Sequence, residues 1–163
     1  MTGPRRLSQA ISEGDGISLI VAVASPEEAR QAEADGAEAL LADDHLDAIR
    51  AATSLPILTA AGSAGDARIV RPGDDDVELG DSVEVVVQVA REEELEEALE
   101  RLDPELFVLA ARDVDDPLEH VLDLLSDLPA GKLAIVDLGN VTKEQLTELE
   151  RAGVDAVLVR ELP

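Results

Sequence analysis

The feature that most constrains the fold of this 163-residue chain is a regular alternation of short aliphatic runs with amphipathic helical stretches. The runs are rich in Val, Ile, Leu and Ala, and we predict eight strands, at residues 17–23, 37–42, 56–60, 67–71, 83–89, 106–110, 132–137 and 156–160. Most of these runs are continuously apolar, as strands covered on both faces are. The alternation therefore predicts an α/β protein with a parallel sheet.

Helices are predicted between these strands, at residues 26–34, 45–53, 92–102, 117–125 and 142–152, with a short one at 6–12 inside an N-terminal segment 1–16. Two of the helices have clear start signals. Ser25 stands before Pro26 and two glutamates, which is the pattern of an N-cap followed by proline at the first helical position. Thr142 and Gln145 have the spacing of a capping box.

One short unit occurs twice, at Gly36 and at Gly153. In each copy a helix ends at a glycine, which is free to take the left-handed conformation, and a buried strand begins two residues later. This is the joint between helix and strand in a repeated βα architecture. Eight strands favour a closed (βα)8 TIM barrel, formed as a single domain by residues 1–163; the competing topology is an open doubly wound sheet.

The chain is shorter than the roughly 200 residues at the lower end for such barrels. Residues 61–66 alone separate the third and fourth strands, where a parallel crossover normally takes about a dozen residues or more. Residues 72–82 join the fourth strand to the fifth, and residues 161–163 follow the eighth. Helices 3, 4 and 8 are therefore expected to be shortened or missing, which gives a compact barrel.

The charge balance excludes several classes of partner. The chain has 37 acidic and 13 basic residues, a formal net charge of −24, which repels phosphate backbones and anionic lipids. It also lacks Trp and Tyr, so stacking platforms for single-stranded nucleic acid are absent. We therefore expect no nucleic acid partner and no membrane.

Cysteine usage and apolar runs add further limits. The absence of cysteine excludes disulfides, thiolate nucleophiles and zinc–cysteine sites. No apolar run approaches the roughly 20 residues of a membrane span, and the first 16 residues lack the hydrophobic region of a signal peptide. We expect a cytoplasmic protein.

Three stretches carry a resemblance to a known family: residues 45–58 (HLDAIRAATSLPIL), residues 92–99 with 109–113 (EEELEEAL and LAARD), and residues 142–159. They resemble the indole-3-glycerol phosphate synthases, the (βα)8 lyases of tryptophan biosynthesis. The resemblance extends with gaps from Ser18 to the C-terminus. It implies the barrel fold, a carbon–carbon lyase activity, a phosphorylated substrate and no cofactor.

Most reactive positions of that family are substituted in this chain. Ala22 stands where the family's first strand carries a lysine, and Ala60 stands where its third strand carries the lysine that serves as general acid. Other strand ends differ as well, with Gln88 at the fifth, Ala110 at the sixth, Asp137 at the seventh and Arg160 at the eighth. Since a positioned acid or base contributes about 10²–10⁴ in rate, the family's ring closure is not expected at a useful speed.

Candidate site residues lie at the ends of the predicted strands, where barrel chemistry occurs. Arg112 and Asp113 keep the second half of the family's sixth-strand motif, and with Asp137 they are the candidate catalytic residues. Ser25, Gly139 and Arg160 are the candidate residues for a small phosphorylated or carboxylated ligand, with Gly139 letting backbone N–H groups approach an anion. The alternative interpretation is that these charges neutralise one another in an empty barrel mouth.

Two further groups of polar residues are interpreted as structural. Asp74, Asp75 and Asp76 lack the spacing of a calcium-binding loop and are expected to form a solvated acidic loop. His45 and His120 lie on different predicted helices without cysteine partners, so they are expected on helix surfaces. No metal site is predicted.

The missing helices suggest an assembly. If Ile57, Ile69, Val85 and Val87 point outward, they form an apolar patch that a two-fold homodimer would bury. The alternative is that residues 72–82 cover the patch through Val77 and Leu79, which keeps a monomer.

Three functions remain open at this point. The chain is a barrel similar to indole-3-glycerol phosphate synthase that lacks the lyase activity and binds at most a small anion, or an active lyase of tryptophan biosynthesis, or a purely structural minimal barrel. The first is favoured over the active lyase because the scaffold segments are retained while both lysines are absent.

Overall fold

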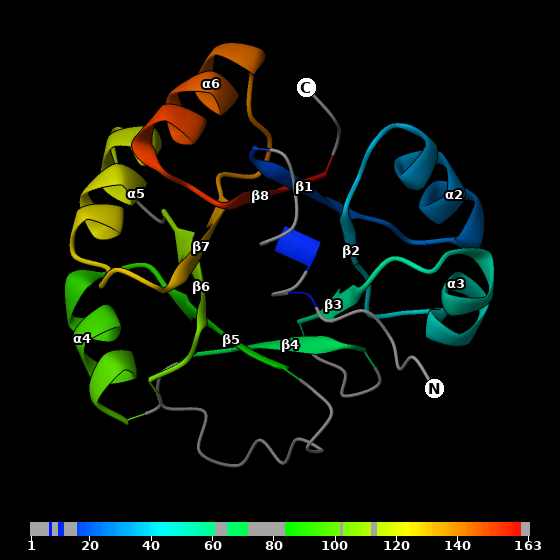
Figure 1. Ribbon diagram of the computed structural model, residues 1–163, viewed down its shortest axis with the longest axis horizontal. Helices are drawn as coiled ribbons and strands as arrows, with labels where there is room; N and C mark the ends of the chain where they lie inside the picture. Colours follow the sequence, from blue (N-terminus) through cyan, green and yellow to red (C-terminus); the bar gives the residue numbers. More distant parts are fainter. Residues whose placement is uncertain are drawn as a thin grey trace.

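Eight parallel strands close into a barrel in sequence order (Figure 1). The structure, a computed structural model, describes residues 7, 10–11, 16–60, 65–71, 84–101, 103–111 and 114–160. The strands are β1 (Ser18–Ala22), β2 (Ala39–Leu41), β3 (Ile57–Thr59), β4 (Ala67–Val70), β5 (Glu84–Val89), β6 (Leu106–Ala110), β7 (Leu133–Asp137) and β8 (Ala156–Val159). Each begins and ends within two residues of its prediction, and β1 pairs with β8 to close the ring. The TIM-barrel prediction is confirmed.

Five helices surround the barrel in the part of the chain that is described: α2 (Pro26–Ala34), α3 (Leu46–Ala52), α4 (Glu92–Arg101), α5 (Pro117–Ser126) and α6 (Lys143–Ala152). They follow β1, β2, β5, β6 and β7, so the predicted shortage of helices compared with a full barrel is confirmed. Figure 1 shows two sectors without a described helix, one between α3 and α4 and one between α6 and α2. Residues 61–64, 72–83 and 161–163, which follow β3, β4 and β8, lie outside the described residues.

The predicted caps and joints are present. The Ser25 hydroxyl accepts the Glu28 N–H at the start of α2, and Thr142 and Gln145 form the capping box of α6. Both repeat glycines have left-handed backbones, with φ of 103° at Gly36 and 98° at Gly153. The left-handed residue lets the chain turn out of the helix and directly into the following strand.

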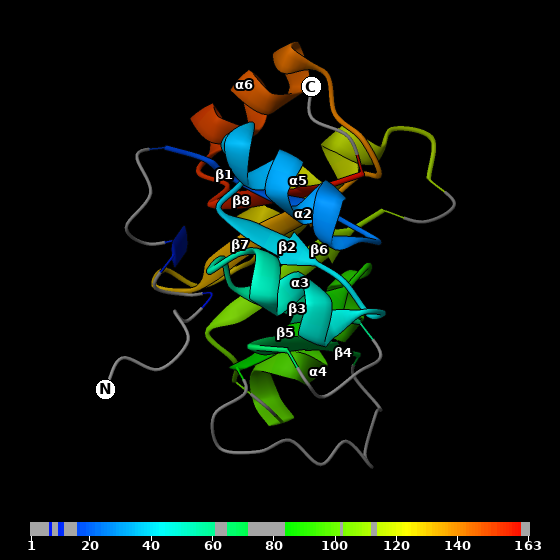
Figure 2. The same ribbon diagram turned by 90° about the vertical axis from the view of Figure 1, so that its right-hand side faces the viewer.

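One apolar layer fills the barrel interior. Its buried side chains include Ile20, Leu58, Ile69, Val86, Val108, Ile135 and Leu158. Leu7 and Ile11 join this layer, and Leu7, Ala10 and Ile11 are helical, which agrees with the short helix predicted at 6–12; the rest of that prediction lies outside the described residues. Figures 1 and 2 show this helical piece over the end of the barrel where the strands begin.

A second apolar layer lies between the strands and the helices. Outward residues such as Val21, Ile57, Val87 and Phe107 pack there with helix residues that include Ala29, Ile49, Leu95, Val121 and Leu149. Because strand side chains alternate between two faces, each strand contributes to both layers. No helix in the described part of the chain is long and apolar enough to cross a membrane.

Ile69 does not meet the condition on which the outward apolar patch depended. Ile69 belongs to the interior layer, where β4 pairs with β3 and β5 in a register that places Ile69 beside Val86. Ile57 and Val87 do point outward, but both are fully buried, and Val85 is half-buried. These four residues therefore do not form an exposed patch, and the homodimer stays a prediction. The alternative cover by residues 72–82 lies outside the described residues.

Buried polar contacts close the short joint between β3 and β4. Asp66, 8% exposed, accepts the Ile57 N–H through Oδ2 at 2.8 Å and the Arg50 guanidinium through the same oxygen at 3.3 Å. The Asp66 N–H in turn donates to the Ile57 carbonyl at 2.8 Å. A Cβ on Gly65 would lie 2.7 Å from the Ile57 carbonyl oxygen, so only glycine fits this close approach of the backbones. Asp66 thus holds the start of β4 against β3.

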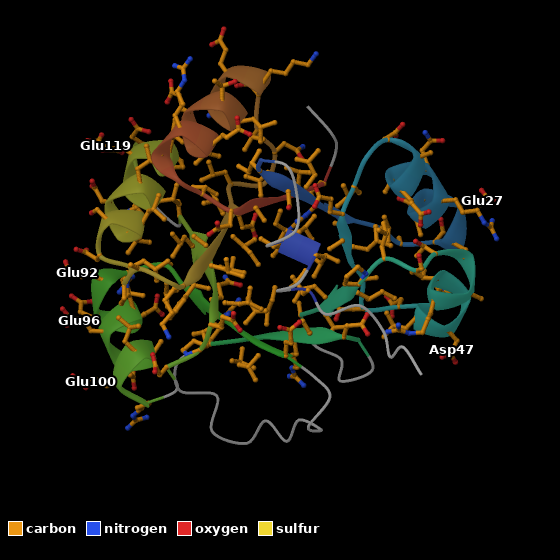
Figure 3. The ribbon with its side chains drawn as sticks, in the orientation of Figure 1. Glu27, Asp47, Glu92, Glu96, Glu100 and Glu119 are labelled. Atoms are coloured by element: carbon orange, nitrogen blue, oxygen red, sulfur yellow. The ribbon has the colours of Figure 1, made fainter. Side chains whose placement is uncertain are left out.

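Acidic side chains cover the outer faces of the helices. Figure 3 shows Glu27, Asp47, Glu92, Glu96, Glu100 and Glu119 pointing away from the barrel on α2, α3, α4 and α5. Some charges are paired, as at Arg101–Glu97 and Lys132–Asp103, but acids outnumber bases by 37 to 13. The outer faces therefore carry substantial self-repulsion.

We expect the melting temperature to rise between low salt and molar NaCl, because added ions screen this repulsion over a Debye length of about 10 Å at 0.1 M. Differential scanning calorimetry measures the effect. A variant with Glu92→Lys, Glu96→Lys and Glu100→Lys on the outer face of α4 should melt higher at low salt and respond less to NaCl. A flat or falling profile for the natural sequence would mean that its acids are locally compensated.

Candidate functional site

The carboxyl ends of the strands form the barrel mouth. Because side chains alternate along a strand, the residue two positions after an interior residue also points inward. These positions are Ala22, Leu41, Ala60, Arg71, Gln88, Ala110, Asp137 and Arg160, each two residues after a member of the interior layer. Ala110 is buried, Gln88 and Asp137 are half-buried, and Arg160 is exposed. The mouth therefore has a floor of small apolar side chains and a few polar groups at its rim.

Asp137 organises the loop between β7 and α6. Its Oδ1 accepts the N–H of Gly139 at 3.0 Å, and Gly139 has a left-handed backbone with φ of 83°. The loop is tied to β8, because the Arg160 N–H donates to Asn140 Oδ1 at 2.9 Å and to the Gly139 carbonyl at 3.3 Å. The structure thus brings the predicted site residues Asp137, Gly139 and Arg160 together. The Gly139 N–H is already bonded to Asp137 within this loop.

Ser25 lies at the start of α2 and serves there as the N-cap. Its hydroxyl lies 3.2 Å from both the Glu28 N and the Glu28 Oε2, and Glu28 Oε2 also accepts the Ala24 N–H at 3.2 Å. Ser25 and Glu28 therefore satisfy one another and the first turn of the helix.

Arg160 also lines a pocket of about 200 Å³ between β1 and α2. The apolar part of the pocket wall consists of Val21, Val23 and Ala32. β8 reaches this place because it pairs with β1, with Val159 opposite Val21.

The polar wall of the pocket comes from one face of α2: Glu28, Gln31 and Asp35. Asp35 accepts two contacts from Gln31 Nε2, at 3.1 and 3.0 Å. Sequence reasoning missed these three residues. Their spacing, three and seven residues after Glu28, marks one helical face, but which face meets β1 and β8 depends on packing.

The other candidate residues fall into three groups. Arg112 and Asp113, the predicted catalytic pair with Asp137, lie outside the described residues, as do Asp74–Asp76. His45 is an exposed residue before α3, in agreement with its prediction. His120 is half-buried on α5 and its Nε2 lies 2.6 Å from the Ala90 carbonyl at the end of β5, so it anchors a strand end.

Two further observations concern the described side chains. Asp43, which follows β2, accepts the Ala60 N–H through Oδ1 at 3.0 Å and so joins the ends of β2 and β3.

Among the residues with described positions, no group of three or more His, Asp or Glu side chains is placed to hold a metal ion.

Fold and mouth together define a (βα)8 barrel with polar residues at the carboxyl ends of its strands. The chain is 29% identical to an indole-3-glycerol phosphate synthase from Variovorax paradoxus (strain S110) over 181 residues, which cover 97% of this chain and 65% of that protein. The chain thus spans about two thirds of the length of the relative it matches. No family model matches the sequence.

A solved structure confirms the architecture independently. The N-acetylmannosamine-6-phosphate 2-epimerase from Clostridium perfringens superimposes with a TM-score of 0.69, covering 88% of this chain and 86% of that one, at 14% identity. At this identity the likeness concerns the fold alone. The predicted resemblance to indole-3-glycerol phosphate synthase is therefore confirmed by sequence, and the barrel by both comparisons.

Proposed function

We propose that this protein is a barrel similar to indole-3-glycerol phosphate synthase that has lost the ring-closing activity and binds a small anion at the carboxyl ends of its strands. The observation that carries the proposal is the row of alanines at the mouth. Ala22, Ala60 and Ala110 occupy inward positions at the ends of β1, β3 and β6, and none of them can transfer a proton.

The lysines of the chain lie elsewhere. Lys132 precedes β7 and pairs with Asp103 at 2.6 Å, and Lys143 is the first residue of α6. The whole sequence contains these two lysines and no others. No lysine therefore takes the place of the two catalytic lysines that the resemblance leads one to expect. Without a positioned acid and base, each contributing about 10²–10⁴ in rate, the barrel has no efficient route through the ring closure.

Arg160 is one group at the mouth that suits an anion. Arg160 is exposed at the end of β8 and lines a pocket, and no described carboxylate pairs with its guanidinium. A guanidinium holds a carboxylate or phosphate through two parallel N–H groups. These features support anion binding without turnover.

We expect no formation of indoleglycerol phosphate when the purified protein is mixed with carboxyphenylamino-deoxyribulose phosphate, the substrate that the resemblance implies. The measurement is indole fluorescence against time, with an active indole-3-glycerol phosphate synthase as positive control. Fluorescence that rises well above the protein-free sample would overturn the proposal. A variant with Asp137→Asn would then show whether that carboxylate takes part.

A further inference from the structure

We infer that the pocket between β1 and α2 binds a small carboxylate with an apolar body and prefers it to a phosphate. The inference rests on the proposed function, because Arg160 is the cation of both. It goes further by assigning the pocket, the chemical class of the ligand and the charged groups that distinguish a carboxylate from a phosphate.

Arg160 is the open hydrogen-bond donor of this pocket. Within the described part of the chain, its guanidinium has neither a hydrogen bond nor an ion pair, and the residue lines the pocket wall. In contrast, the polar groups on the opposite wall bond to one another, with Gln31 donating to Asp35. A ligand that enters the pocket therefore meets one charged donor without a partner, the Arg160 guanidinium, and two carboxylates, Glu28 and Asp35, whose hydrogen bonds leave their negative charge in place.

Several of the backbone donors that a phosphate site would use are already occupied here. Phosphates are commonly held by free N–H groups at helix N-termini and glycine loops. The Gly139 and Arg160 N–H groups bond within the β7–α6 loop, as described above. At the start of α2, the Ala24 N–H bonds to Glu28 Oε2 and the Glu28 N–H to Ser25 Oγ. Recognition is left to the planar guanidinium, which can pair with a carboxylate or a phosphate, so the charge of the pocket wall has to distinguish the two.

The charge and the size of the pocket also favour a small carboxylate. Glu28 and Asp35 line the pocket, so a phosphate monoester with close to two negative charges meets more repulsion than a carboxylate with one. The volume of about 200 Å³ is below the usual range of roughly 300–1,000 Å³ for ligand pockets, so a single ring is an appropriate size. Val21, Val23 and Ala32 provide the apolar surface for that ring.

The test uses the full chain and three probes that share one ring: benzoate, benzamide and phenyl phosphate. Amide resonances are followed by two-dimensional NMR at physiological salt. We expect benzoate to shift the amides of Ala22, Val23 and Ala32 in a saturable way, benzamide to leave them unchanged, and phenyl phosphate to bind at least about fivefold more weakly. Arg160→Gln should weaken benzoate binding about tenfold or more, because a charge-assisted bidentate contact is lost.

Arg30→Gln is the matched control. Arg30 lies on the same helix, is exposed and does not line the pocket, so this change removes one positive charge without touching the site. Benzoate affinity should stay within about twofold of the unmodified protein, since screened exposed charges contribute little.

The outcomes separate the inference from the function on which it rests. Phenyl phosphate binding as tightly as benzoate, or benzoate binding that survives Arg160→Gln, would overturn the inference and leave anion binding by the barrel intact. If neither benzoate nor phenyl phosphate shifts any amide, the anion-binding half of the proposed function fails as well.

Discussion

Ile69→Asp is expected to abolish folding, with no cooperative thermal transition and loss of the helical circular dichroism signal. Ile69 is 7% exposed in the barrel interior and packs in the same layer as Leu58 and Val86. A carboxylate there has no partner. The free-energy cost of burying it unpaired is comparable to the whole stability of a native domain, roughly 5–15 kcal/mol.

Ile69→Val is the matched control for this position. It keeps the residue apolar and removes one methylene, so the free energy of unfolding should fall by about 0.5–1.5 kcal/mol. An Ile69→Asp protein that melts cooperatively near the temperature of the unmodified chain would mean that this side chain points outward and that the strand register is different.

Asp66→Ala is expected to lower the free energy of unfolding by about 3 kcal/mol, measured by urea denaturation. The change leaves the Ile57 N–H without its acceptor inside the β3–β4 joint and leaves Arg50 without its partner. Asp66→Asn should be milder, because an amide oxygen can still accept the Ile57 N–H while the charge pair is lost.

Glu97→Ala gives the comparison for an exposed ion pair. Glu97 and Arg101 pair at 3.3 Å with side chains 43% and 64% exposed, so its loss should change stability by less than about 0.5 kcal/mol. If Asp66→Ala were equally mild, the joint between β3 and β4 would be held by something other than this carboxylate.

The strands and helices could be predicted because their signals are local. Continuous aliphatic runs marked β6 and β8, and the caps at Ser25 and Thr142 marked where α2 and α6 begin. The direction in which Ile69 points was left open as a condition of the dimer, although Arg68 gave a usable signal. An arginine beside it belongs outside the barrel, and alternation along a strand then turns Ile69 inward.

The candidate site could be predicted only in part. Asp137, Gly139 and Arg160 were found because strand ends are the functional end of a barrel. The face of α2 that forms the pocket with Arg160 depends on the pairing of β1 with β8, which are separated by most of the chain. The structural role of Asp66 likewise follows from the approach of two strands, which a single sequence does not reveal.

The most direct test of the account follows the carboxylate of carboxyphenylamino-deoxyribulose phosphate, labelled there with carbon-13, in the presence of excess protein. Excess protein makes even a single turnover visible, and the ring closure releases this carbon as carbon dioxide. We expect the labelled carboxylate resonance to persist undiminished through a long incubation. Its decay, with bicarbonate appearing at a rate above the protein-free sample, would show that the barrel still closes the ring.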